Sequence, residues 1–431
     1  MAGGWRRIAW LGALAAPAVL TLALIAAHGV NTPQHDQWMG LTPLLVLHDR
    51  GELKFEHFYD QHNEHRPLVP TAINFGLAQL TGWNIRAELF LNFAVALATF
   101  VLVALALRRT LDRKAFAAAA VVSSIIFFSP RQWENWLNGW QLEWFLSNLA
   151  ALGAFWALTS LHERRPRAGL AVAVGCALVA TYSLGQGLLV WPLGLALLLL
   201  RRQPWRLWVL VTVVVAFAYF DGYDDPDHHP SKTIVFERPF QFLKYVGRYL
   251  GGPFGAGDAT GGIAGVLLLG VFAFAAVHVL RRRADGDLFD RTAFWLAAGS
   301  YAIGAAVITG VSRLGFGWAQ ASASRYTTMA CLFGIATLAL VLAVAPRVDA
   351  PRPRALVAGF VVALLVVSLA NTTRGVGQFR EDAENLEVVA ACVRNARSPQ
   401  DRCLHHARFS HGVGLHYVGI LWLRDKGWAG F

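Results

Sequence analysis

The chain has 431 residues, of which 55% are hydrophobic and only 15% are charged, and its mean hydropathy is +0.43. This composition excludes an ordinary soluble protein of the same length and predicts an all-α polytopic membrane protein. The formal net charge is +11, but the arginines lie in short clusters between apolar segments, where the positive-inside rule places them. The predicted surroundings are therefore a lipid bilayer and no nucleic acid.

The apolar segments predict about eleven membrane-spanning helices, within a range of about ten to twelve. Their approximate limits are 8–30, 87–107, 115–129, 145–161, 168–183, 188–200, 207–220, 262–280, 292–309, 327–345 and 355–370. No convincing signal-peptidase site follows the first segment, so we expect a retained helix. Basic clusters at 6–7, 108–114, 164–167, 201–206, 281–283 and 347–354 all fall on one side of this arrangement. They predict a cytoplasmic N-terminus and an extracytoplasmic C-terminus.

This topology divides the chain into a transmembrane module, residues 1–370, and a small C-terminal extracytoplasmic segment, residues 371–431. The two long outer loops of the module are 31–86 and 221–261. Residues 67–82 are apolar but short and predict an interfacial or re-entrant helix, and 236–250 predict an amphipathic juxtamembrane helix. Cys392 and Cys403 lie in the C-terminal segment, where a disulfide and two free thiols are equally compatible with the sequence.

The first outer loop carries most of the unusual chemistry. It collects His35, Asp36, His62, Glu64, His65 and Arg66, together with further acids and histidines, within about thirty residues. Such groups are expensive to keep beside lipid unless they bind something or take part in a reaction. The loop therefore predicts a site that faces the extracytoplasmic side.

Asp36 follows the first predicted span closely and is the candidate general base, with Glu64 as its acidic partner. The alternative for Asp36 is a solvated acid that caps a helix beginning near Trp38. A second hypothesis is a divalent metal ion (Mg²⁺, Mn²⁺ or Zn²⁺) held by Asp36, His62, Glu64 and His65. A hydrogen-bonded site without metal is an equal alternative, and the HExxH motif of zinc proteases is absent.

Arg325 and Tyr326 begin a late apolar span on the extracytoplasmic side, where an arginine opposes the positive-inside tendency. Such an arginine needs an anionic ligand or an acidic partner within the protein. Arg325, Tyr326, Arg66 and Lys232 are therefore the candidates for binding a donor phosphate. The alternative for Arg325 is a salt bridge, for example to Asp36 or Glu64.

The aromatic stretch 133–144 can form an interfacial belt or stack on sugar rings. The candidate residues for binding sugar or acceptor are His35, His62, His65, Trp133, Glu134, Asn138 and Gln141. Glu134, Asn138 and Gln141 have the spacing of one helix face. Asp224, Asp225, Asp227, His228 and His229 form a second acid–histidine group, and Pro226 and Pro230 mark it as a loop that serves solvation or gating rather than ligation.

The chain resembles the GT-C-type glycosyltransferases in its many spans, in Asp36 just after the first helix, in the acids and histidines through Glu64, in the amphipathic loop 221–261, and in Arg325 beside Tyr326. The resemblance implies transfer of a sugar from a polyprenyl-phosphate donor to a hydroxyl of a glycan, lipid or protein acceptor. In this chain HDQ stands where the family carries an adjacent acidic pair. The Ala- and Arg-rich composition with short loops is typical of a bacterial protein, so the expected location is the inner membrane with the site facing the periplasm or cell exterior.

Three other functions remain open from the sequence, one of which is a structural or assembly membrane protein whose outer loops bind a partner. A polymerase or ligase of lipid-linked glycans uses similar substrates on the same side of the membrane. A non-enzymatic transporter or flippase of lipid-linked glycans would carry charged or Gly/Pro-broken residues at mid-membrane depth.

Overall fold

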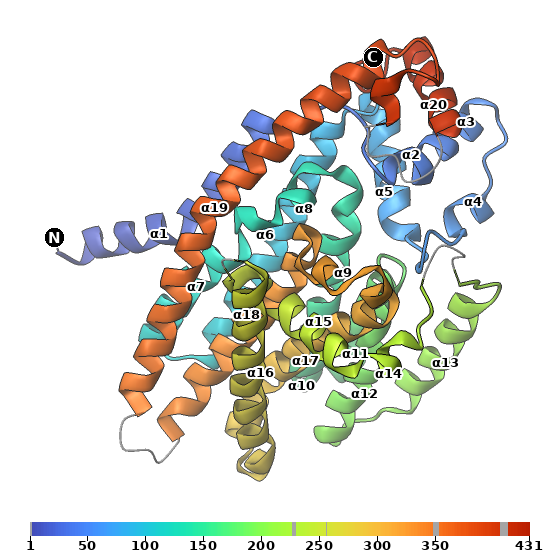
Figure 1. Ribbon diagram of the computed structural model, residues 1–431. Coiled ribbons are helices and arrows are strands. Elements are labelled where there is room, and N and C mark those ends of the chain that lie inside the picture. Colours follow the sequence, from blue (N-terminus) through green and yellow to red (C-terminus); the bar gives the residue numbers. More distant parts are fainter. Residues whose placement is uncertain (1, 226–229, 256, 348–352, 406–412) are drawn as a thin grey trace.

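The computed structural model describes residues 2–225, 230–255, 257–347, 353–405 and 413–431, and within these ranges the chain is helical, with no strand (Figure 1). The helices of the first half are α1 (Ala2–His28), α2 (Gln37–Gly40), α3 (Thr42–Asp49), α4 (Phe55–Tyr59), α5 (Leu68–Thr81), α6 (Ile85–Thr110), α7 (Arg113–Phe127), α8 (Trp133–Leu137), α9 (Leu142–Trp156), α10 (His162–Arg164) and α11 (Pro166–Thr181). Those of the second half are α12 (Val190–Leu200), α13 (Arg206–Phe220), α14 (Ile234–Glu237), α15 (Pro239–Gly251), α16 (Asp258–Arg281), α17 (Asp287–Arg313), α18 (Thr327–Val344), α19 (Pro353–Asn395) and α20 (Val413–Lys426).

Among the described residues, eight helical segments are long and apolar enough to cross a membrane: 4–28, 85–110, 113–137, 139–164, 259–281, 287–316, 324–347 and 354–395. Each overlaps one predicted span. Three shorter apolar helices, Pro166–Thr181, Gly185–Leu200 and Arg206–Phe220, coincide with the three remaining predicted segments. The protein is therefore an all-α polytopic membrane protein.

The core of the bundle surrounds α18, because 83% of the most apolar window of that span is buried. The corresponding share is 17% for α1 and for α19, which lie at the periphery. Helices α15 and α16 approach closely through glycines: a Cβ on Gly265 would lie 1.8 Å from the carbonyl oxygen of Gly247. Small residues allow such backbone contact between helices within a membrane.

The arginine-rich helix ends meet at one end of the bundle, here called the arginine-rich end. Glu163, after α9, accepts ion pairs from Arg109 at the end of α6 and from Arg201 after α12. Arg201 also pairs with Asp290 of α17, at 3.0 Å between Nη1 and Oδ1. The basic clusters of these helices thus lie on one side, together with the few acids that neutralise them.

The C-terminal segment packs on the first outer loop rather than standing apart. Helix α19 runs without a break across the expected boundary at 370/371, and its far end lies beside α20 (Figure 1). Arg394 of α19 donates to the carbonyl oxygen of Asn31 (2.9 Å) and to Thr32 Oγ1 (2.8 Å). Farther along, the Ala429 amide donates to the Gly82 carbonyl oxygen (3.1 Å). The segment thereby holds both ends of the loop.

The question left open for the cysteines is answered by a disulfide between Cys392 and Cys403, whose Cα atoms are 5.9 Å apart. The bond joins the last turn of α19 to the short 3₁₀ turn Arg402–His405. Disulfides are typical of oxidising compartments, so this bond agrees with an extracytoplasmic C-terminal segment.

Two predicted helices are interrupted. The stretch 133–144 is not one helix, because Asn138 adopts an extended conformation between α8 and the 3₁₀ turn Gly139–Gln141. Glu134, Asn138 and Gln141 therefore do not share a helix face, contrary to expectation. The stretch 236–250 breaks at Arg238, because the following Pro239 disfavours a helical conformation for the residue before it.

Candidate functional site

The first loop presents Asp36 at the start of α2. His35 precedes it in a left-handed conformation (φ 46°), and Asp36 occupies the N-cap position of the helix without a side-chain capping hydrogen bond. The sequence alternative, a purely capping carboxylate, is therefore not what the structure contains. Asp36 Oδ1 lies 3.9 Å from His62 Nε2, a distance that suits an ion pair but is too long for a hydrogen bond.

A tight turn directs the two histidines of the loop. The amide of His62 donates to the carbonyl oxygen of His65 (2.8 Å), the amide of His65 donates back (3.1 Å), and Asn63 within the turn has a φ of 50°. The two imidazole rings end 6.2 Å apart. His62 packs on the ring of Trp140 (5.0 Å) and faces Asp36, whereas His65 turns inward to Glu143.

The inward pair joins His65 Nε2 to Glu143 Oε2 at 3.0 Å, and both side chains are largely buried. Burial alone would lower the pKa of His65, but the carboxylates of Glu143, Glu64 and Asp36 raise it above its ordinary value. A positively charged His65 is therefore favoured in the folded protein. The pair fixes the turn on α9.

The second carboxylate of the turn, Glu64, forms an ion pair with Arg313 at the end of α17 (2.6 Å). Its carbonyl oxygen accepts a hydrogen bond from the hydroxyl group of Tyr223 (3.2 Å). Glu64 thus connects the first loop to both the α13–α14 connection and α17. It does not pair with Arg325.

Arg325 pairs instead with Glu134 of α8, at 2.6 Å between Nη1 and Oε1. The backbone around it is held as well, since Asn135 Nδ2 donates to the Arg325 carbonyl oxygen (2.9 Å). Tyr326 is buried and stacks on Tyr249 of α15, with ring centroids 5.0 Å apart. The start of α18 is therefore fixed between α8 and α15.

Electrostatic coupling links these pairs into one neighbourhood. Burial by itself would raise the pKa of Asp36, but the interactions with His62, His35 and Arg325 lower it to about 2. Asp36 and Glu64 in turn both act on His65. Asp36 thus lies within electrostatic reach of Arg325, and Asp36 and Glu64 both lie within reach of His65.

Arg66 has a different environment. It is 5% exposed, and its guanidinium donates to the carbonyl oxygens of Tyr219 (2.9 Å), Tyr59 (3.0 Å) and Asp221 (2.7 Å). These bonds tie the first loop to the end of α13. The structure therefore gives Arg66 the position of a connector between two chain segments.

The other candidate residues lie in varied positions. Lys232 pairs with Asp225 on the exposed second loop, and Asp227, His228 and His229 of that loop lie outside the described residues. The Asn138 side chain accepts a hydrogen bond from the Trp140 amide (2.9 Å). Gln141 is buried, and Trp133 is half-buried against the core.

Glu88 is a residue that the sequence analysis missed. It is 1% exposed and accepts hydrogen bonds from Gln37 Nε2 (2.6 Å) and from Trp83 Nε1 (2.9 Å). A Cβ on Gly139 would lie 1.8 Å from its Oε2 atom, so only glycine fits there. The available signal was an acid in the first turn of an apolar span, which is costly in a membrane unless it has a specific role.

The four side chains of the metal hypothesis do not form one cluster in this arrangement. Asp36, His62, Glu64 and His65 divide among three separate pairs, two of which involve Arg313 and Glu143. Within the described ranges no three His, Cys, Asp or Glu side chains are grouped so that they could hold a metal ion.

Comparison of the chain with protein-family models, with curated proteins and with solved structures finds no match.

Proposed function

We propose that the protein is a membrane glycosyltransferase that moves a sugar from a polyprenyl-phosphate donor to an acceptor hydroxyl on the extracytoplasmic side. The observation that carries the proposal is the position of Asp36: its carboxylate faces His62 in the first outer loop, within the field of Arg325. A proton acceptor and a phosphate-binding cation in one neighbourhood are the two groups that such a transfer requires.

Asp36 is the proposed general base. With a pKa of about 2 it stays ionised at neutral pH, but it is a weak base toward a free hydroxyl. It therefore accepts a hydrogen bond from the acceptor hydroxyl first and takes the proton late, once the sugar carbon has become cationic.

Arg325 and Arg313 are the proposed donor-phosphate ligands. Arg325 forms an ion pair with Glu134, and Arg313 forms one with Glu64. Because a guanidinium has five N–H donors, each arginine keeps donors for phosphate oxygens. Arg66, committed to three backbone carbonyls, has no part in this proposal.

The acceptor oxygen forms a bond to the anomeric carbon while the bond from that carbon to the phosphate oxygen breaks, with inversion at the carbon. The hydroxyl proton passes to Asp36, and the bond electrons leave with the phosphate. Arg325 and Arg313 compensate the negative charge of that leaving group. No step is assigned to a metal ion.

The proposed topology has about eleven spans, counting the three short apolar helices, with the N-terminus in the cytoplasm. The site then faces the periplasm or the cell exterior of a bacterial inner membrane. The donor reaches it from the outer leaflet, and the acceptor is a glycan, lipid or protein hydroxyl.

The test is incubation of purified protein with radiolabelled polyprenyl-phosphate sugars and a mixture of acceptors, with and without EDTA. We expect a labelled product in both conditions, none with Asp36→Asn, and wild-type amounts with Asp60→Asn, because Asp60 is an exposed acid of the same loop. Turnover by Asp36→Asn would remove Asp36 from the reaction, and abolition by EDTA would require a metal. Movement of intact lipid-linked sugar across vesicles without product would favour a flippase. A chain of repeated units would favour a polymerase.

A further inference from the structure

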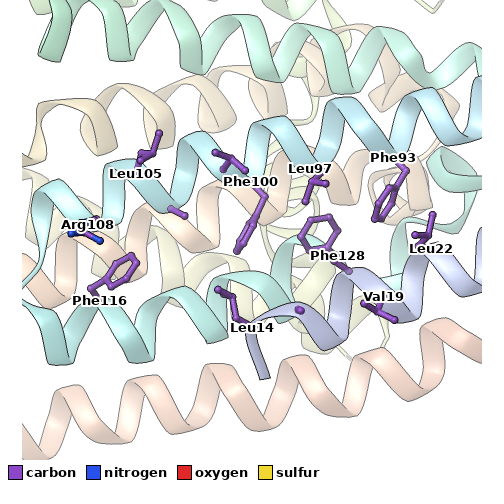
Figure 2. A pocket seen from close by; sticks show the side chains of 14 residues that line it. Leu14, Val19, Leu22, Phe93, Leu97, Phe100, Leu105, Arg108, Phe116 and Phe128 are labelled. Atoms are coloured by element: carbon purple, nitrogen blue, oxygen red, sulfur yellow. The ribbon is translucent and has the colours of Figure 1, made fainter. Parts of the chain in front are cut away.

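A groove of about 560 Å³ lies between α1 and α6. Its walls are apolar side chains of the two helices, and Phe116 and Phe128, at the start and just after the end of α7, complete the lining (Figure 2). Arg108 is the one charged residue among the lining side chains, and Figure 2 shows it at one end beside Phe116, with Phe93 and Leu22 at the other end.

The groove is maintained by the way α1 attaches to the bundle. Trp10 Nε1 donates to the Ala117 carbonyl oxygen (3.0 Å), and Ser124 of α7 donates to the carbonyl oxygen of Leu14 (2.7 Å). Thr21 donates to the carbonyl oxygen of Phe128 (2.6 Å). These bonds fasten α1 to α7 along the whole length of the groove, so α1 stands off from α6.

Small side chains also line the groove. Ala15 and Ala18 line it from α1, and Ala104 lines it from α6. Two other lining residues, Val19 (60% exposed) and Val101 (52% exposed), face outward and leave the groove open to the surrounding bilayer. Its occupant therefore arrives from the lipid phase.

Arg108 and Arg109 are neighbours in sequence but differ in their environment. Arg109 pairs with Glu163 at 2.8 Å, whereas Arg108 is exposed, and no acidic side chain of the described residues is paired with it. Arg113 and Lys114 follow at the same end of the bundle, so the mouth of the groove beside Arg108 is positively charged. A cation at the end of an apolar groove matches a lipid with an anionic headgroup.

The length of the groove matches one lipid chain. Phe93 and Arg108 are fifteen positions apart on α6, which is about 22 Å along a helix. One leaflet contributes about 15 Å of the hydrocarbon core, and helix tilt shortens the depth that the groove spans. The groove therefore extends from the headgroup level at the arginine-rich end to just beyond the middle of the bilayer.

We infer that this groove is a binding site for an anionic phospholipid of the leaflet at the arginine-rich end, with one acyl chain between α1 and α6 and its phosphate on Arg108. The inference does not depend on the proposed transferase activity. The phosphate–guanidinium contact selects the anionic headgroup, and the apolar walls hold the chain without selecting its exact length.

The test measures lipids that remain bound after purification, by native mass spectrometry of protein extracted from membranes that contain phosphatidylglycerol and phosphatidylethanolamine. We expect the wild-type protein to keep phosphatidylglycerol. Arg108→Gln should lower its retention about tenfold, the ratio that corresponds to about 1.4 kcal/mol. Ala104→Trp, which fills the groove, should abolish it. The matched control Arg206→Gln, an exposed arginine at the start of α13 outside the groove, should retain wild-type amounts.

Reconstitution in nanodiscs provides the second measurement, which stays informative if Ala104→Trp fails to fold. Phosphatidylglycerol nanodiscs should raise the melting temperature above that in phosphatidylcholine nanodiscs for the wild type and for Arg206→Gln, but not for Arg108→Gln. Equal retention by wild type and Arg108→Gln would overturn the inference. Retention of added polyprenyl phosphate in place of phosphatidylglycerol would also overturn the inference. Retention of detergent with no lipid would overturn it as well.

Discussion

Gln37 donates a 2.6 Å hydrogen bond to the buried carboxyl group of Glu88, and this contact joins the start of the first outer loop to the start of α6. Gln37 is also fixed on its other side, because its Oε1 atom accepts from the Gln34 amide (3.0 Å). Asp36 precedes Gln37 directly, so the position of the proposed base depends on a residue that never meets the substrate.

Replacing Glu88 by glutamine should therefore lower both stability and transfer. Glu88 serves two donors, Gln37 Nε2 and Trp83 Nε1, whereas glutamine has a single acceptor oxygen. Gln37 cannot turn its amide around without losing the bond to Gln34. One buried donor is then left without a partner, which costs about 1–3 kcal/mol.

Thermal unfolding and the transfer assay measure the two effects of Glu88→Gln. Glu52→Gln is the matched control, since Glu52 is an exposed acid of the same loop. Wild-type stability and turnover in Glu88→Gln would show that the carboxylate does not position the loop.

The pair of His65 and Glu143 predicts a dependence of stability on pH. The pKa of His65 is raised in the folded protein, so the charged imidazole favours folding. Its contribution is fully present below the ordinary histidine value of about 6.5 and is lost as the pH rises through the raised pKa. We expect the melting temperature to fall between pH 6.5 and the alkaline side of neutrality, and to fall less in His65→Gln. An identical slope in the two proteins would exclude His65 as its source.

Substitution of Arg66 distinguishes a structural role of this residue from a role in phosphate binding. Arg66→Lys keeps the charge, but one ammonium group cannot replace three hydrogen bonds to separate carbonyl oxygens. We expect a loss of about 3 kcal/mol or more in the free energy of unfolding, with an unchanged KM for the donor. Arg50→Lys, at an exposed arginine of the same loop, serves as the control. A raised KM with unchanged stability would instead return Arg66 to the phosphate site.

Removing the disulfide should loosen the C-terminal segment. The double variant Cys392→Ser/Cys403→Ser frees a crosslink across 11 residues next to Arg394, which holds Asn31 and Thr32. For a loop of this size the expected loss is about 2–3 kcal/mol. Limited proteolysis of the segment and the melting temperature measure it, and the reduced wild-type protein should behave like the variant. A segment that resists protease equally in all three samples would contradict this expectation.

The positions of the long apolar helices could be predicted because hydropathy depends on local sequence alone. The interruptions at Asn138 and Arg238 follow local chemistry that was also readable: an Asn–Gly step and a residue before proline. The outer-loop residues Asp36 and Glu64 could be selected because charge is rare in this chain. Their partners could not, because Glu64–Arg313 and His65–Glu143 join residues far apart in sequence, and only the packed bundle decides which cation meets which acid.

The contact between Ala429 and Gly82 also has a consequence for biosynthesis. A ribosome that adds about 5–20 residues per second reaches α20 roughly 20–60 s after it has completed the loop that α20 later covers. During that interval the nascent loop lacks its contact with the C-terminal segment and is accessible to proteases and chaperones. The first loop therefore gains this contact only after the C-terminal segment has been synthesised.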